Sequence, residues 1–244
     1  VALRFGTIGS AVIFIGAAYF VITSMGASVG VWYAVLVGAI GGIIVGLVTE
    51  YYTGGAPVRK IAKDGETGPA TVMISGLAIG MQSVAIPVLT IAAIIFFANL
   101  SAGLYGVGMA AVGMLATVGI TMAIDAYGPV ADNAGGIAEM AEMGPETREI
   151  TDSLDEVGNS TAAIGKGFAI SAAALAALAL ISAYIVKVSN GDPDFVLAIN
   201  DPIVLVGMFI GGIFPFLVSS ITMTAVGDAA FEMIIEVRRQ FKEI

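Results

Sequence analysis

Two stretches of the sequence carry polar side chains at intervals of seven residues. They are Asp125, Asp132 and Glu139 (the acidic stripe) and Asp152, Asn159 and Lys166 (the mixed stripe). Seven residues advance an α-helix by about 10.5 Å and return almost to the same face. Each stretch therefore predicts a helix with polar groups along one side, and the mixed stripe runs from a carboxylate through an amide to an ammonium.

The residue types of the two stripes suit a phosphate held with magnesium. Carboxylate and amide oxygens are hard ligands that Mg²⁺ accepts, and lysine acts as a point charge on phosphate oxygens. Lys166 lies between Gly165 and Gly167 next to an apolar run, a position that favours an anionic partner. The chain has no histidine and no cysteine, so thiolate chemistry and a typical zinc or copper site are excluded.

Two other interpretations of the same residues stay open at this point. Carboxylates and lysines also line the cation paths of secondary transporters. A run of charge can simply be a solvated helix face, and we interpret five glutamates in that way, namely Glu139, Glu142, Glu146, Glu149 and Glu156. Because nine of the nineteen acidic residues lie between Asp125 and Glu156, nucleic acid is excluded as a partner, and the absence of a P-loop leaves ATP without support.

The composition indicates that lipid surrounds most of the chain. Of 244 residues, 58% are hydrophobic and 12% are charged, and the mean hydropathy is +0.97. Apolar runs of roughly twenty residues, without the alternation of a barrel strand, predict an all-α polytopic transmembrane helix bundle. Six membrane-spanning segments are expected at about 7–24, 30–53, 69–98, 103–126, 161–187 and 200–225.

The distribution of Lys and Arg predicts which connections are cytoplasmic. If Arg4 is cytoplasmic, the connections 54–68 and 127–160 share its side, and among the basic residues only Lys187 falls opposite. Helix-compatible sequence continues through 127–160, so two helices are expected to extend into the cytoplasm and to join near Gly144 and Pro145. Residues 125–166 then form the cytoplasmic extensions that carry the site.

Small residues are dense on two of the predicted helices and predict close helix packing within the membrane. They are Gly38, Gly41, Gly42 and Gly46 on the second helix and Ala172, Ala173, Ala174, Ala176 and Ala177 on the fifth.

Several long motifs resemble those of the membrane-integral pyrophosphatases. The resemblance rests on Asp125-Ala-Tyr-Gly-Pro-Val-Ala-Asp-Asn-Ala-Gly-Gly and on Gly158-Asn-Ser-Thr-Ala-Ala-Ile-Gly-Lys-Gly-Phe-Ala-Ile170. Glu50-Tyr-Tyr-Thr53 and Gly103-Leu-Tyr-Gly-Val-Gly-Met109 also agree, so the resemblance covers essentially the whole chain. It implies a single transmembrane segment, 1–244, of a larger helical pump, about helices eight to thirteen, with both ends expected to be internal cuts.

The resemblance also implies a function and roles for individual residues. Such a pump couples Mg²⁺-dependent hydrolysis of pyrophosphate to outward movement of H⁺ or Na⁺, and it is a multi-pass homodimer, in the cell inner membrane of a prokaryote. Asp132 and Asn159 match magnesium-site positions, with Asp125 in a supporting metal role, and Lys166 together with Asn159 is expected to bind pyrophosphate. The other acid-rich motifs of the family lie outside these residues, so the segment alone is expected to be inactive.

Within the family, the requirement for potassium depends on two positions near the lysine. A potassium-independent member would carry lysine and threonine where this sequence has Ala162 and Gly165. A tethered ammonium can replace bound K⁺, so alanine predicts potassium dependence. The sequence also departs from the family pattern: it lacks a glycine after Ile170, has Ser160 in place of threonine, and has Gln82 where lysine is common. A segment of a secondary cation transporter and a catalytically silent remnant are the alternatives.

Overall fold

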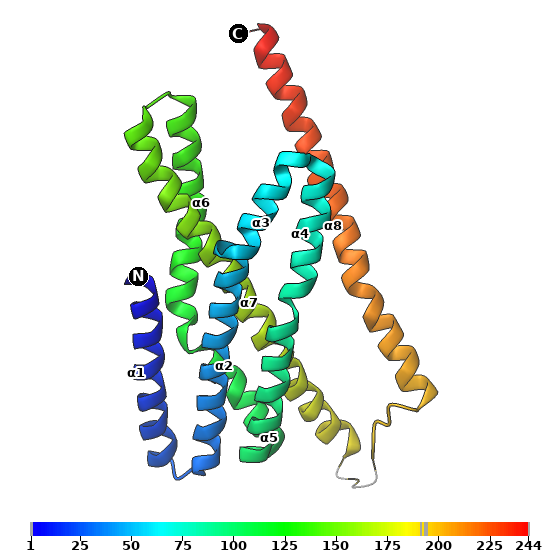
Figure 1. Cartoon of the computed structure of the whole chain (residues 1–244). Coiled ribbons are helices and arrows are strands. Elements are labelled where there is room, and N and C mark those ends of the chain that lie inside the picture. Colours follow the sequence, from blue (N-terminus) through cyan, green and yellow to red (C-terminus); the bar gives the residue numbers. More distant parts are fainter. Residues whose placement is uncertain (1, 191, 193–194, 244) are drawn as a thin grey trace. The chain divides into compact units, whose positions relative to one another are not determined.

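The computed structural model describes residues 2–190, 192 and 195–243, with side chains from Phe5 onward, and this part of the chain contains helices and no strand (Figure 1). The α-helices are α1 (Ala2–Ser24), α2 (Val29–Gly54), α3 (Ala56–Asp64), α4 (Pro69–Ser83), α5 (Ala85–Met114), α6 (Val118–Met140), α7 (Pro145–Ser189) and α8 (Pro202–Glu243). Two short 3₁₀ turns, η1 (Gly65–Thr67) and η2 (Leu115–Thr117), complete the order. The chain divides into two compact units, Val1–Val188 and Ser189–Ile244.

Among the described residues, five helical stretches are long and apolar enough to cross a membrane, and one of them, Pro69–Met140, includes α4, α5 and α6. Its helical geometry is lost at Ala102 (φ −153°) and Gly103 (φ 62°). The chain turns back on itself there: Gly106 lies against the carbonyl oxygen of Ala98, although eight residues of continuous helix would separate the two by about 12 Å. The predicted division between segments 69–98 and 103–126 is confirmed at this reversal.

Local sequence explains where the neighbouring helices end. Gly144 (φ 89°) takes the left-handed conformation that glycine tolerates, and Pro145 then opens α7. The predicted junction of two helices near Gly144 and Pro145 is confirmed. Between α4 and α5 the helix is interrupted at Val84, since Pro87 has no N–H to donate to the carbonyl of Ser83. The single helix predicted over 69–98 is therefore wrong in this detail.

The core of the first unit lies where α2 packs against both arms of α5. Gly38 meets the backbone of Ala110, and Gly113 meets the backbone of Val35, closely enough that neither glycine has room for a Cβ. Ile94 and Leu175 are almost fully buried beside this contact. The prediction that glycines on the second helix permit close packing is confirmed.

Two other regions differ from the predictions made from sequence. Residues 56–64, expected only as part of a cytoplasmic connection, form α3, and α8 continues to Glu243 rather than ending near residue 225. The side chain of Arg4 lies outside the described residues, as do residues 191, 193 and 194 between the predicted segments 161–187 and 200–225.

Candidate active-site face on the α6–α7 pair

Helices α6 and α7 form an antiparallel pair whose contact consists of small residues. A Cβ built on Gly158 would lie 2.7 Å from the Cα of Gly128, so the two backbones cross in direct contact. Seven residues away on either side, Gly135 lies opposite Thr151 and Thr121 lies opposite Gly165. We call this contact the glycine seam. Its period of seven equals that of the two polar stripes.

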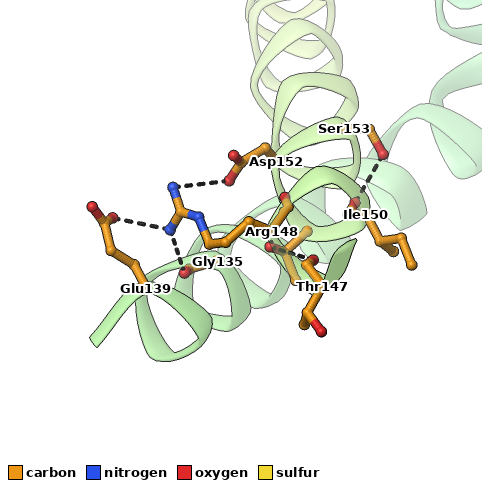
Figure 2. Close-up of polar contacts among 8 residues, drawn as sticks. Gly135, Glu139, Thr147, Arg148, Ile150, Asp152 and Ser153 are labelled. Atoms are coloured by element: carbon orange, nitrogen blue, oxygen red, sulfur yellow. Dashed lines mark hydrogen bonds and ion pairs between the residues drawn. The ribbon is translucent and has the colours of Figure 1, made fainter. Parts of the chain in front are cut away.

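The two stripes lie on the same side of the glycine seam. Arg148, in the first turn of α7, donates a hydrogen bond to Glu139 Oε2 (3.0 Å) of the acidic stripe and lies 3.3 Å from Asp152 Oδ1 of the mixed stripe. It also donates to the carbonyl oxygen of Gly135 (3.1 Å), as Figure 2 shows. One guanidinium therefore joins both stripes at the tip of the pair.

The register of the seam interleaves the stripes along the pair. From the tip toward the membrane, the order is Glu139, Asp152, Asp132, Asn159, Asp125 and Lys166, alternating between α6 and α7. Asp132 lies four residues from Gly128 and Lys166 lies eight residues from Gly158 in the opposite direction, which places them about 18 Å apart along the axis at 1.5 Å per residue. The six polar side chains are thus spread along the helix pair rather than gathered in one cluster. We call this alternating row the ladder.

The predicted site residues differ in exposure. Asp132, Asn159 and Lys166 are exposed, whereas Asp125 is half-buried. Asn159 donates from Nδ2 to Asp155 Oδ1 (3.0 Å), an interaction that leaves its amide oxygen available as a ligand. Among the described residues no group of three Asp, Glu, His or Cys side chains is close enough to hold a metal by itself. The donor types fit Mg²⁺, but a complete coordination shell requires groups beyond this face.

The two potassium-related positions lie beside Asp125. Gly165 is buried, and a Cβ there would lie 3.6 Å from Thr121 Cγ2 and 4.0 Å from Asp125 Oδ1. Ala162 is half-buried and lies three residues, slightly less than one turn, from Gly165 on α7. With glycine at position 165, no side chain from that position covers the carboxylate of Asp125.

The absent glycine after Ile170 leaves no break in α7. The helix continues through Ile170 and Ser171, and the buried positions Gly158, Gly165 and Ala172 keep the interval of seven across them. The packed face of α7 therefore runs in phase from the polar end into the apolar end.

A cavity lies on the other side of α7 from the mixed stripe. It has a volume of about 600 Å³ and is enclosed by α1, α2, α6 and α7. Ile43, Ile164 and Phe168 make it largely apolar, and Glu50 and Glu156 are its charged lining residues. None of the predicted site residues lines this cavity.

Three features of this face were missed in the sequence. They are the seam glycines Gly128 and Gly158, the bridging role of Arg148, and a hydrogen bond from Tyr127 OH to the carbonyl oxygen of Leu154 (3.3 Å). The sequence did contain a signal for the seam glycines, because small residues recur every seven positions beside each stripe. The partners of Arg148 and Tyr127 depend on how two helices meet, which spacing within either helix does not specify.

Fold and site together define a polytopic integral membrane protein in which two paired helices extend a polar face at one end. Comparison with known sequences is more specific: residues 1–244 match the family model described as inorganic H⁺ pyrophosphatase, and the chain belongs to that family. This membership favours the pyrophosphate interpretation over a secondary cation transporter.

Similar proteins share the whole chain or most of it. A relative in Clostridium tetani, whose name places it among K⁺-stimulated pyrophosphate-energized sodium pumps, is 51% identical over 100% of this chain and 37% of its own length. A K⁺-insensitive pyrophosphate-energized proton pump of Methanosarcina mazei is 44% identical over the same shares. The K⁺-stimulated pyrophosphate-energized sodium pump of Thermotoga maritima is 45% identical over 87% of this chain and 31% of its own. The matched region thus spans about a third of the length of each of these relatives, from 31% to 37%.

Proposed function

We propose that the complete protein is a membrane-bound inorganic pyrophosphatase that couples Mg²⁺-dependent hydrolysis of pyrophosphate to outward transport of H⁺ or Na⁺. The α6–α7 face would form one wall of its active site. The observation that carries this proposal is the alternating ladder of Asp132, Asn159, Asp125 and Lys166, because it places oxygen ligands and a cation along one exposed face. The other wall would come from the remaining helices of the pump.

Each group on the ladder has a role that follows from its chemistry. Asp132 and Asn159, with Asp125 in support, would hold Mg²⁺, which neutralises the charge of pyrophosphate when it is bound. Lys166 would contact phosphate oxygens and stabilise the charge that develops on the leaving phosphate. The ladder is long enough to contact a polyanion together with several cations bound to that polyanion. It is longer than the binding of a single ion would require.

We also propose that this pump is stimulated by K⁺. The carboxylate of Asp125 is not covered by a side chain from Gly165, and Ala162 adds no charge nearby. A cation from solution would be needed to supply the positive charge that a lysine at position 162 supplies in a potassium-independent pump. Relatives of both kinds exist, as their names state. A homodimer in a multi-pass membrane setting, surrounded by lipid, completes the proposal.

The test is hydrolysis of pyrophosphate by the complete protein in membranes, with Mg²⁺ and K⁺ supplied. Lys166→Ala and Asp132→Asn should each lower kcat by at least about a hundredfold, since each removes electrostatic stabilisation of the transferred phosphate. Lys187→Ala, at the opposite end of the same helix, is the matched control and should retain activity. Near-parental hydrolysis by either Lys166→Ala or Asp132→Asn would refute the assignment of this face.

A further inference from the structure

The contacts that α7 makes around Lys166 lie on the sides of the helix away from that lysine. At 100° per residue, Ile164 and Phe168 are each about 160° around the helix from Lys166. Gly165 and Gly167 are each about 100° from it, in opposite directions. All four neighbours meet another helix of the first unit. The direction of Lys166 is therefore set by what packs behind it.

Phe168 packs against two glycines of α2. A Cβ built on Gly42 would lie 3.3 Å from Phe168 Cε1, and a Cβ built on Gly46 would lie 3.2 Å from Phe168 Cζ. Gly42 and Gly46 are four residues, about one turn, apart, so their missing side chains leave a notch on α2 that receives the ring. We call these two glycines the α2 notch. Phe168 is 5% exposed, which makes it a buried anchor of α7 two residues from the lysine.

The glycines on either side of Lys166 bring α7 close to two different helices. A Cβ on Gly167 would lie 3.0 Å from Thr49 Oγ1 of α2, and a Cβ on Gly165 would lie 3.6 Å from Thr121 Cγ2 of α6. Helix α7 is therefore held between α2 and α6 at the level of the lysine. A rotation of α7 there would press one of these glycines into its neighbour.

We propose that Phe168 is a positioning residue for Lys166. Seated in the α2 notch, its ring fixes the rotation and the height of α7 at which the ammonium group reaches pyrophosphate. This role presupposes the proposed function of the α6–α7 face. It also makes α2 a support of the site, although α2 supplies none of the proposed ligands.

The experiment measures kcat and KM for hydrolysis of pyrophosphate by the complete protein in membranes, together with the thermal midpoint in detergent. Phe168→Ala should lower kcat about tenfold, because a displacement of about 1 Å is enough to impair a reacting group. KM should change less, since the proposed magnesium ligands Asp132 and Asn159 are not supported by this ring. A kcat near that of the parent would overturn the proposal.

Leu175→Ala is the matched control for a purely structural effect. Leu175 lies seven residues beyond Phe168 on the same face of α7 and is fully buried (0% exposed). Its replacement should lower the thermal midpoint at least as much as Phe168→Ala does, but it should leave kcat near the parental value below that midpoint. Equal losses of kcat in the two variants would show a general loosening of α7 and would overturn the proposal.

A compensating pair tests the same contact from both helices and decides the matter if Phe168→Ala alone does not fold. Gly46→Leu should lower kcat, because the added side chain occupies the place of the Phe168 ring. The double variant Gly46→Leu with Phe168→Ala roughly conserves volume in the notch and should be several-fold more active than either single variant. A double variant no better than the single variants would overturn the proposal. Parental activity in Lys166→Ala would instead refute the proposed function itself.

Discussion

The two connections of the first unit that were predicted to be cytoplasmic are built on opposite plans. Helix α3 carries three basic residues and one acidic residue and buries none of them. The connection 127–160 contains eight acidic residues and one basic residue, Arg148, and is organised around buried glycines. The difference teaches that exposed charge needs no internal packing, because water solvates it. Charge that must hold a defined ligand requires a rigid contact behind it.

The largest difference between the two connections is expected when a side chain is introduced into the glycine seam. Gly158→Val should separate α6 from α7, because a Cβ at this position would already lie 2.7 Å from the Cα of Gly128. Overpacking of this kind costs about 1–3 kcal/mol, and here it would also displace the mixed stripe. We expect a lower thermal midpoint in detergent and loss of pyrophosphate hydrolysis.

The matched change in the basic connection is Ala62→Val, at an exposed residue of α3. It should leave the thermal midpoint nearly unchanged. If both variants unfold at the parental temperature, the seam is not the rigid contact described above.

A second prediction sharpens the role of the buried Gly165 and the neighbouring Ala162. Ala162→Lys should make hydrolysis of pyrophosphate largely independent of K⁺, because the added ammonium would occupy the region near Asp125. The measurement is the ratio of rates with and without K⁺ in the complete protein. Ala163→Lys, one residue along the same helix, is the control, and an unchanged K⁺ response in Ala162→Lys would contradict the proposal.

A smaller effect is expected when the bridge between the stripes is removed. Arg148→Ala would lose the contacts to Glu139 and Asp152, both of which are exposed carboxylates. Exposed ion pairs contribute about 0–1 kcal/mol each, so stability should fall only slightly and hydrolysis by a few-fold. Added salt should narrow the difference between parent and variant, and a difference that widened with salt would argue against an electrostatic bridge.

The smallest effect is expected for an acidic residue outside the ladder. Glu142 lies in the turn between α6 and α7, is exposed, and takes part in no ion pair within the described residues. Glu142→Gln should leave the rate of hydrolysis and the thermal midpoint near those of the parent. A large loss of activity would show that the tip of the acidic connection is more than a solvated face.

The sequence predicted more of the acidic connection than of the basic one. Intervals of seven and the pair Gly144 and Pro145 were sufficient for two helices joined by a turn, because those signals are local. The contact of Gly128 with Gly158 was not predicted, since a residue without a side chain shows no preference for a partner. Helix α3 was missed because nine residues between two glycine-rich boundaries resemble a loop, although Arg59, Lys60 and Lys63 follow a helical period.

The interleaving of the two stripes has a mechanical consequence. Successive polar residues of the ladder alternate between α6 and α7. If one helix slid along its axis, each acidic group would therefore move closer to one neighbour on the other helix and away from the next. The contact of Gly128 with Gly158 opposes such sliding, because a change of register would bring a residue with a side chain to a place that has no room for a Cβ. The fixed register matters because both stripes have the same period of seven, so a displacement of one residue, about 1.5 Å, would change the spacing of all neighbouring pairs at once.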